Sequence, residues 1–316
     1  MPAAHLLRTT FSLLLALLAS TAHAATDCPA PVAPPTPEQL AAAAAAATQD
    51  HGLLWRARRD GHDSYLYGTL HVGRLAWAMP GPQQSQAWQA TDTLALELDI
   101  SDPQTVRALT SGVPAPALSA KTKGRIAAQI AAECLPAGAL AAMHPLMQLS
   151  TLTVLTARRD ELDAGYAQEA ILLGMAQAAK RRVVALETPQ EQLDALIPKD
   201  PRELQRALDD GLTQLERKEV RAPMLKLARA WAASDLPLLQ TYEDWCDCIH
   251  DEADRRYMHG LLAARNPRIA ERFAALHAGG QRVFVAVGAL HMVGPEGLPA
   301  QLKKMGFELT RLVPAP

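Results

Sequence analysis

Residues Val283–Gly294 read VFVAVGALHMVG, and residues Ser64–Gly73, far earlier in the chain, read SYLYGTLHVG. Each is an apolar run that breaks at a Gly-x-x-His step and has another glycine shortly after the histidine. Short apolar runs of this kind are typical of strands buried in a sheet. A glycine near the end of such a strand lets a neighbouring backbone approach closely. We therefore expect two related strands, one ending at His71 and the other at His291.

Two further apolar runs end at a carboxylate. Residues 93–98 (TLALEL) contain Glu97, and residues 183–187 (VVALE) contain Glu187. Imidazole and carboxylate groups have no use inside a buried strand, because burying them without a partner is costly. Ligands of open α/β sheets gather at the carboxyl ends of the strands. We therefore predict that the two glutamates and the two histidines converge on one crevice.

The remaining pattern predicts an α/β (mixed α+β) fold whose central sheet is built from two related halves. A hairpin over residues 53–71 opens the sheet, and residues 307–313 form its last strand. Between residues 190 and 276 apolar residues recur every three or four positions without a convincing strand, which indicates a long helical insert. We expect a single domain over residues 52–316, preceded by a flexible Pro/Ala-rich tether over residues 25–51.

The first 24 residues have the form of a secretory signal peptide. Arg8 supplies a positive start, Phe11–Leu18 form an apolar core too short to cross a bilayer, and Ala22-His23-Ala24 match a cleavage site. No second stretch of membrane length follows in the sequence. We therefore expect an exported, soluble protein, periplasmic or secreted, with no membrane span after removal of the signal peptide.

The charge and the motifs of the sequence argue against nucleic-acid binding, membrane-surface binding and serine-hydrolase activity. The formal net charge is −2, and the basic residues form no patch of the kind that binds nucleic acid or membrane surfaces. Ser64, Ser85 and Ser150 lack the strand–turn–helix setting of a serine-hydrolase nucleophile. We predict no nucleic-acid partner, and we place the chemistry at the histidines and glutamates.

Four cysteines lie beyond the signal peptide: Cys28, Cys134, Cys246 and Cys248. An even number in an exported chain favours two disulfides. Because Cys246 and Cys248 are so close in sequence, we expect each to pair with Cys28 or Cys134. A metal site made of Cys246, Cys248 and His250 is the alternative, although on a helix residue 248 points away from the face that the other two share.

Two imidazoles and two carboxylates suit a borderline divalent metal ion, and the pattern does not distinguish Mn, Co, Zn and Fe. Such an ion lowers the pKa of a bound water, whose proton a neighbouring glutamate can accept. The structural alternative is an internal duplication in which the histidines only end the strands.

Taken together, these motifs resemble the TraB/GumN family, which includes the Tiki metalloproteases. The similar stretches cover most of the chain from about Leu53 to Leu312: YLYGTLHVG, LALELD, LDAGYAQEAILLGMAQAAKRRVVALETPQEQL, RNPRIAERFAAL and VFVAVGALHMVGPEGLPAQLKKMGFELTRL. The resemblance implies a mixed α/β fold with two related halves and, in the Tiki branch, metal-dependent hydrolysis of peptides.

Carried over to this sequence, the resemblance implies that His71, His291 and Glu97 hold the divalent ion. Glu97 is either a ligand or the general base, and both interpretations stay open. Glu187 either takes part in catalysis or orients a histidine through a hydrogen bond. Arg265, in the RN element of the family, either stabilises an oxyanion or clamps a substrate carboxylate, with an ion pair on a helix surface as its structural alternative.

The resemblance also matches Asp163 to the acid of a Gly-x-Asp step, although Glu161 stands where many relatives have glycine. We predict an exported metal-dependent hydrolase, specifically a peptidase that acts on a peptide or protein substrate. The alternative is a non-catalytic envelope protein of the same fold that binds and sequesters a peptide.

Overall fold

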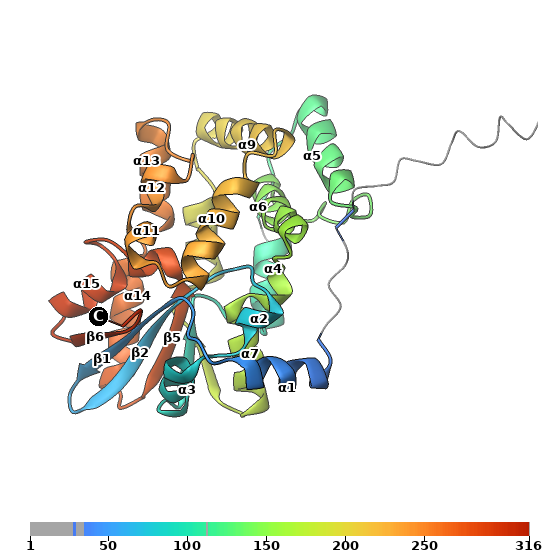
Figure 1. The fold of residues 1–316 in the computed structure, drawn as a ribbon. Helices are drawn as coiled ribbons and strands as arrows, with labels where there is room; N and C mark the ends of the chain where they lie inside the picture. Colours follow the sequence, from blue (N-terminus) through green and yellow to red (C-terminus); the bar gives the residue numbers. More distant parts are fainter. Residues whose placement is uncertain (1–27, 30–34, 112, 316) are drawn as a thin grey trace, which may run out of the picture.

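A mixed sheet of six strands, in the order β4–β3–β5–β2–β1–β6, forms one end of the protein, and most of the helices stack beyond it (Figure 1). The computed structural model describes residues 28–29, 35–111 and 113–315, so the predicted signal peptide lies outside the described residues. The prediction of an α/β fold with one central sheet is confirmed.

Every apolar run that was predicted to be a strand forms one. The strands are β1 (Leu53–Arg59), β2 (His62–Thr69), β3 (Thr93–Leu96), β4 (Arg182–Ala185), β5 (Val283–Gly288) and β6 (Glu308–Val313). Strands β4, β3, β5 and β2 are parallel, whereas β1 pairs antiparallel with both β2 and β6. The four parallel strands are the ones that precede the histidines and glutamates singled out in the sequence.

Helices make up much of the rest of the described chain, and many begin with proline in the first turn, where its missing N–H costs nothing. They are α1 (Pro37–Ala46), α2 (Leu75–Ala78), α3 (Pro82–Gln89), α4 (Pro103–Ser111), α5 (Ala120–Ala132), α6 (Pro145–Thr156), α7 (Gln168–Ala178), α8 (Pro189–Leu196), α9 (Pro201–Glu216), α10 (Arg221–Ala232), α11 (Leu236–Gln240), α12 (Tyr242–Trp245), α13 (Glu252–Leu261), α14 (Asn266–Ala278) and α15 (Leu298–Lys304), with 3-10 turns η1 (Ala157–Asp160), η2 (Ala164–Tyr166) and η3 (Ala289–Met292). Residues 190–276, all of which are described, contain no strand, as predicted.

The two repeated stretches lie side by side in the middle of the sheet. Strands β2 and β5 are parallel neighbours, with Gly68 opposite Val287 and Thr69 opposite Gly288. Strand β3 pairs with the other edge of β5. A Cβ atom at Gly68 would lie 3.0 Å from the Cα atom of Ala289, so glycine leaves room for the chain after β5 to turn into η3. The carboxyl ends of β2, β3 and β5 are thereby held next to one another.

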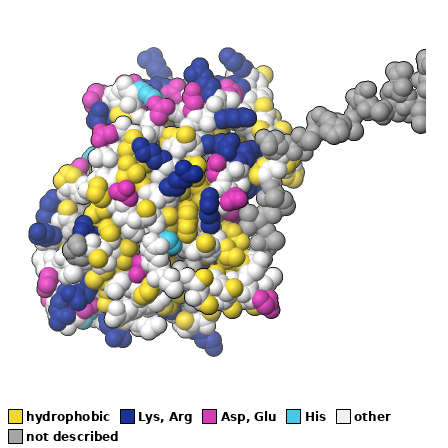
Figure 2. All heavy atoms as spheres, viewed as in Figure 1, with side chains coloured by type: hydrophobic (Ala, Val, Ile, Leu, Met, Phe, Trp, Pro, Cys, Tyr) yellow, Lys and Arg dark blue, Asp and Glu magenta, His cyan; other side chains and the backbone are white. Residues whose placement is uncertain are grey.

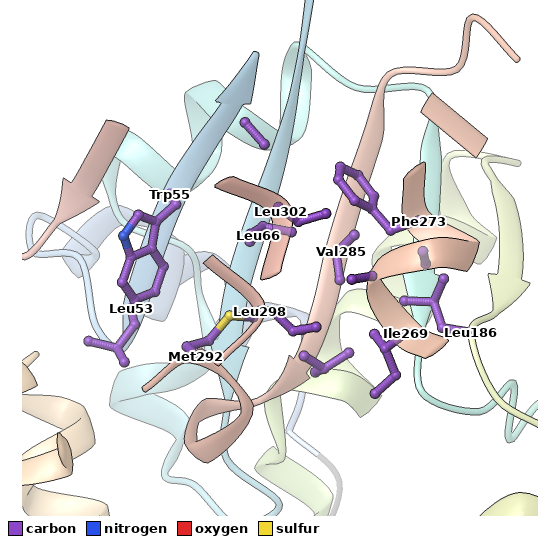
Figure 3. Packing of buried hydrophobic residues seen from close by; sticks show 14 of the residues in the cluster. Leu53, Trp55, Leu66, Leu186, Ile269, Phe273, Val285, Met292, Leu298 and Leu302 are labelled. Carbon is purple, nitrogen blue, oxygen red and sulfur yellow. The ribbon is translucent and has the colours of Figure 1, made fainter. Parts of the chain in front are cut away.

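Apolar side chains cover both faces of this sheet. On one face, Phe273 and Ile269 of α14 pack beside Val285 of β5 (Figure 3). On the other face, Phe284 of β5 packs with Trp88 of α3 and with residues of α7. Burying one such side chain contributes about 1.5–3 kcal/mol. The strands that carry the candidate residues are therefore fixed from both sides.

The disulfides join Cys28 to Cys134 and Cys246 to Cys248. The prediction that the two neighbouring cysteines each pair with Cys28 or Cys134 is therefore wrong, and the alternative metal site that includes them is excluded. Asp247 between them has a φ of 55°, the left-handed conformation. It turns the chain so that the two Cα atoms lie 5.1 Å apart, within the range that a disulfide spans.

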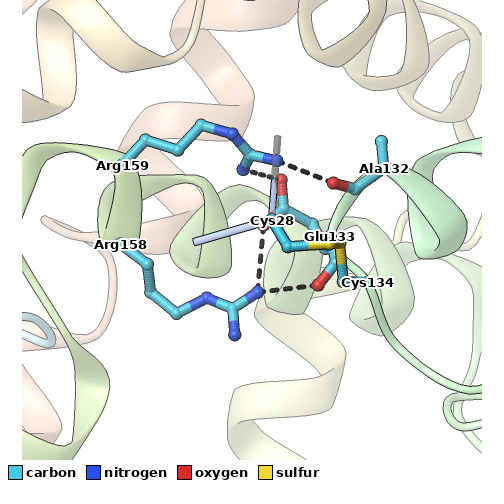
Figure 4. The surroundings of a disulfide bond; sticks show 6 residues. All are labelled: Cys28, Ala132, Glu133, Cys134, Arg158 and Arg159. Carbon is cyan, nitrogen blue, oxygen red and sulfur yellow. Dashed lines mark hydrogen bonds and ion pairs between the residues drawn. A yellow bond between two sulfur atoms is a disulfide. The ribbon is translucent and has the colours of Figure 1, made fainter. Parts of the chain in front are cut away.

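The Cys28–Cys134 bridge fastens the segment before α1 to the end of α5 (Figure 4). Beside the bridge, the buried carboxylate of Glu133 pairs with Arg158 and Arg159. The bridge therefore lies next to a buried cluster of ion pairs in the helical region.

The surface carries both signs of charge. On the face seen in Figure 2, Lys and Arg side chains are interspersed with Asp and Glu over the helical part of the molecule, in keeping with a formal net charge of −2. Among the described helices, none combines the length and apolar character that a membrane span needs.

Candidate active site

The carboxyl ends of the parallel strands bring the predicted residues to one edge of the sheet. Glu97 directly follows β3, Glu187 comes shortly after β4, and His71 shortly after β2. His291 lies in η3, immediately beyond β5. The backbone N–H of Glu187 donates to the carbonyl of Glu97 at 2.9 Å, which continues the β3–β4 ladder into the site. Arg265, at the start of α14, reaches this edge from the helical region.

Arg265 joins the two glutamates. Its Nη2 lies 2.7 Å from Glu97 Oε2, and its Nε donates to Glu187 Oε1 at 2.8 Å. The side-chain amide of Gln192 in α8 donates to both carboxylates, at 3.0 Å to Glu97 and 3.2 Å to Glu187. The side chains of Arg265 and Glu187 are 15% and 3% exposed. This is a buried ion triad within the site and not the surface ion pair that was its structural alternative.

Glu97 lies between the arginine and a histidine. Its Oε1 accepts the backbone N–H of Gly288 at 2.8 Å and lies 3.9 Å from His291 Nε2. Burial alone would raise the pKa of Glu97, but His291, in its protonated form, and the permanent charge of Arg265 lower it to about 2. Glu97 is therefore anionic at neutral pH and can attract a cation.

His291 is buried, and Asn266 sets the orientation of its ring. His291 Nδ1 lies 2.7 Å from Asn266 Oδ1, while the amide nitrogen of Asn266 donates to the carbonyl of Glu296 at 2.8 Å. Since the amide of Asn266 already donates through its nitrogen, its oxygen is the acceptor and His291 Nδ1 carries the hydrogen. Burial lowers the pKa of His291, which favours the neutral ring that binds metal ions. Nε2 is thus left to face Glu97.

His71 lies at the opening of the site, where its side chain is 68% exposed. Its Nδ1 is 3.0 Å from Oε1 of Glu169, a carboxylate in the first turn of α7. The hydroxyl of Thr69 donates to the same oxygen. The charge of Glu169 raises the pKa of His71. Here too Nδ1 faces an oxygen acceptor, so Nε2 is the nitrogen that a metal ion would bind, in competition with the proton that the raised pKa favours.

Two imidazole Nε2 atoms and an anionic carboxylate form a donor set that a borderline divalent ion accepts. His291 Nε2 lies 3.9 Å from Glu97 Oε1, and His71 follows β2, the strand that pairs in parallel with β5. In the described part of the chain, however, no three His, Cys, Asp or Glu side chains are spaced to hold an ion as they stand. The residues therefore fit a divalent ion in their chemistry, while binding one requires these side chains to move closer together.

Asp163 has a different place. Its backbone forms an isolated antiparallel bridge with Gly73, with N–O distances of 3.0 and 2.9 Å. Its carboxylate accepts the N–H of Gly165 at 2.7 Å. Asp163 thus holds the loop that follows His71. Glu161, which stands where many relatives have glycine, has a φ of 60°, the left-handed conformation that glycine adopts most easily.

Three residues of the site were not predicted: Gln192, Asn266 and Glu169. Asn266 follows Arg265 in the RN element, and that pairing was the one available indication of a role. Gln192 and Glu169 lie within helices, in the stretch of residues 162–193 that contributes to the resemblance, but nothing in that pattern distinguishes them, so only the folded chain shows that they reach the site.

Sequence comparison finds known proteins that are similar to this chain. The sequence model of the TraB/PrgY/gumN family matches residues 53–311, from the start of β1 into β6. The metalloprotease TIKI1 of Danio rerio is 38% identical over 60 residues, which are 19% of this chain and 12% of that protein. The metalloprotease TIKI1 of Xenopus tropicalis is 37% identical over 65 residues, which are 20% of this chain and 13% of that protein.

The chain thus matches only a small part of the length of these curated relatives. No solved structure matches it. The family match, by contrast, covers β1 to β5, the first part of β6 and both Gly-x-x-His steps. This chain belongs to the TraB/PrgY/gumN family.

Proposed function

We propose that this protein is a metal-dependent peptidase in which His71, His291 and Glu97 hold a divalent ion. The observation that carries the proposal is the common arrangement of the two histidines. In each, Nδ1 faces an oxygen acceptor, at 3.0 Å for His71 and 2.7 Å for His291, and Nε2 is left for a ligand. Fixing one ring nitrogen in this way is how proteins orient metal-binding histidines. The metalloprotease name of the TIKI1 relatives supports the same chemistry.

A bound ion would polarise the carbonyl of the substrate and lower the pKa of a water molecule. The chain's own residues prepare the site for this. Asn266 holds His291, and the N–H of Gly288 holds Oε1 of Glu97. The low pKa of Glu97 keeps its carboxylate charged, as a ligand must be.

Arg265 acts in this proposal as a positioning residue. Its Nε and Nη2 are bound to Glu187 and Glu97, and its Nη1 donates to the carbonyl of Leu261 at 2.8 Å. A guanidinium occupied on all three nitrogens has little capacity left for a substrate carboxylate. Glu187 in turn holds Arg265, so the pair keeps Glu97 in place.

The second candidate is a protein of the same fold that binds and sequesters a peptide without cleaving it. The spacing of the ligand residues favours it, because among the described residues no three of them stand close enough to hold an ion without movement. Turnover separates the two candidates. A sequestering protein inhibits in proportion to its amount and leaves no new N-terminus on its ligand.

Metal analysis tests the proposal directly. The protein, purified without chelator and without a metal-binding tag, should contain about one divalent ion per chain, and the His71→Ala/His291→Ala double variant should contain none. Peptide profiling by mass spectrometry should show new N-termini with the wild type and not with His291→Ala. Unchanged metal content in the double variant would contradict the metal site.

We also propose that the chain is exported to the periplasm or the medium after removal of residues 1–24, and that residues 52–316 form one domain. The two disulfides support export, because such bonds persist in oxidising compartments. N-terminal sequencing of the protein from the exported fraction should begin at Ala25. Protein that retains Met1 and stays in the cytoplasm would contradict it.

A further inference from the structure

Glu169 differs from the other buried acids of the described chain in what balances its charge. Glu97 and Glu187 are paired with Arg265, and Glu133 is paired with two arginines. Glu169, only 18% exposed, has the imidazole of His71 as its ion-pair partner among the described residues. Because Glu169 is paired with a histidine and not with an arginine, its contact with His71 is the interaction that its role must explain.

The second oxygen of Glu169 strengthens this view. Oε2 is buried and has no hydrogen-bond partner, whereas Oε1 receives both the Nδ1 of His71 and the hydroxyl of Thr69. Leaving a buried acceptor unpaired costs stability. Fold stability alone therefore does not account for a carboxylate at this position, and its bond to His71 remains as the reason for it.

The surroundings of Glu169 fix it in place. It lies in the first turn of α7, where the helix dipole favours a negative charge. The neighbouring Gln168 accepts the backbone N–H of Leu70 through its Oε1 at 3.1 Å, which ties the start of α7 to the end of β2. Thr69 is the last residue of β2, and His71 lies two residues beyond it. The acceptor and the ring that it binds are thus held by adjoining residues.

The two histidines are oriented by different means. The side chain of His291 is 3% exposed, so packing already restricts its ring, and a neutral amide of Asn266 suffices as acceptor. The side chain of His71 is 68% exposed and has no such packing. A charged acceptor binds an N–H more strongly than a neutral one and makes the other ring nitrogen a better ligand.

We propose that Glu169 is the positioning residue for His71, which holds the Nδ1–H of the ring and so presents Nε2 to the divalent ion. This inference rests on the proposed function, because it assigns a role within the same metal site. It makes the His71 side a carboxylate–histidine pair and the His291 side an amide–histidine pair.

Two substitutions separate the charge of Glu169 from its hydrogen bond. Glu169→Gln keeps the shape and an oxygen acceptor but removes the charge, whereas Glu169→Ala removes both. The control is Glu161→Gln, which removes a carboxylate that is 86% exposed in the same region and contacts Arg74 at 3.8 Å. Each variant is made in the mature chain without a metal-binding tag.

The first readout is the affinity for Co²⁺, which is measured from the visible absorption bands of the bound ion. Glu169→Ala should bind Co²⁺ about 10- to 100-fold more weakly than the wild type, and Glu169→Gln should show a smaller loss. The thermal unfolding temperature of Glu169→Ala should be unchanged or raised, because the unpaired buried oxygen is removed, whereas Glu169→Gln keeps an unpaired polar atom there, its amide nitrogen, and should not be stabilised. Glu161→Gln should match the wild type in both measurements.

The second readout needs no metal. In the metal-free protein at alkaline pH, ¹⁵N NMR of the His71 ring should show the hydrogen on Nδ1 in the wild type and in Glu169→Gln. In Glu169→Ala it should move toward Nε2. A role for Glu169 in packing alone would not change this tautomer.

Wild-type affinity together with an unchanged Nδ1–H form in Glu169→Ala overturns the proposal. Where Glu169→Ala fails to fold, Glu169→Gln decides, since weaker Co²⁺ binding supports the proposal and wild-type binding overturns it. A wild-type protein that binds neither Co²⁺, Zn²⁺ nor Mn²⁺ refutes the proposed metal function, and the NMR comparison then still decides whether Glu169 positions His71.

Discussion

Gly288, the first residue of the second Gly-x-x-His step, donates its backbone N–H to Oε1 of Glu97 at 2.8 Å. The repeated motif therefore does more than carry a histidine. Its glycine bonds the carboxylate that follows the neighbouring strand, and its histidine lies 3.9 Å from the same oxygen. The end of β5 and the adjoining η3 thus supply one proposed ligand, His291, and hold a second one, Glu97, through the N–H of Gly288.

The two motif glycines should respond differently to alanine. A Cβ at Gly68 would lie 3.0 Å from the Cα of Ala289, which is backbone and cannot easily move, whereas a Cβ at Gly288 would be 3.5 Å from Glu97 Oε1. We expect Gly68→Ala to lower the free energy of unfolding by about 1–3 kcal/mol and Gly288→Ala to have a smaller effect. Urea denaturation of the two variants measures this. Equal losses of unfolding free energy in the two variants would show that the short distance between residue 68 and Ala289 does not restrict the side chain at position 68.

Removing Arg265 should be far more harmful than removing a neighbouring surface arginine. Arg265→Ala leaves the carboxylates of Glu97 and Glu187 buried together without a counter-charge. Removing one partner of a buried ion pair typically lowers the free energy of unfolding by about 3–5 kcal/mol. Arg268→Ala, three residues further along the chain, removes an exposed partner of Glu191 and should cost less than about 1 kcal/mol. Denaturant unfolding compares them, and similar costs would mean that the triad contributes no more than a surface ion pair.

The two disulfides should differ in their contribution to stability. The Cys28–Cys134 bridge spans 106 positions of sequence, and the Cys246–Cys248 bridge spans 2. Closing a long loop restricts the unfolded chain much more, by about 4 kcal/mol or more in the chain-entropy account. Cys28→Ser/Cys134→Ser should therefore lower the unfolding temperature much more than Cys246→Ser/Cys248→Ser does. The opposite order in calorimetry would rule out this entropic origin.

Stability should fall in mild acid because of His277. Its ring is fully buried and stacked 3.8 Å from that of His62, with Nδ1 2.9 Å from Ser64 Oγ and Nε2 3.0 Å from the carbonyl of Arg59. Burial lowers the pKa of His277. The unfolded chain then binds this proton more readily than the folded chain does, so the free energy of unfolding decreases as the pH falls below about 6.5, the ordinary value for histidine.

Urea denaturation of the wild type at pH 7.5 and at pH 5 measures this loss. His277→Gln has no titrating ring at this position and should lose less stability between the two pH values. An equal loss in wild type and variant would assign the acid sensitivity to other groups.

The strands and the acidic strand ends could be predicted because the information is local. Each apolar run stops at a polar group whose burial is costly, as at Glu97, and the parallel strands that follow from this pattern end at one edge. The same reasoning could not find Glu169 or Gln192. Both lie in ordinary helical stretches, and their contacts with His71 and Glu97 arise only when segments distant in sequence come together.

The disulfide pairing was predicted wrongly for a comparable reason. Proximity in sequence argues against a Cys246–Cys248 bridge, whereas the left-handed backbone at Asp247 brings the two residues to bridging distance. Aspartate is among the few residues besides glycine that adopt this conformation, but it does so only occasionally, so Asp247 does not by itself predict the turn.

The order of strands in the sheet has a consequence for how the protein is made. Strand β5, from residues 283–288, is inserted between β2 and β3, which are synthesised far earlier. Until β5 arrives, the space between those two strands is open, and neither His291 nor the N–H of Gly288 is present beside Glu97. Pairing of segments so distant in sequence is a slow step in folding. The proposed ligands therefore come together only after residues 283–291 have left the ribosome, so a chain synthesised only as far as β4 has no assembled site.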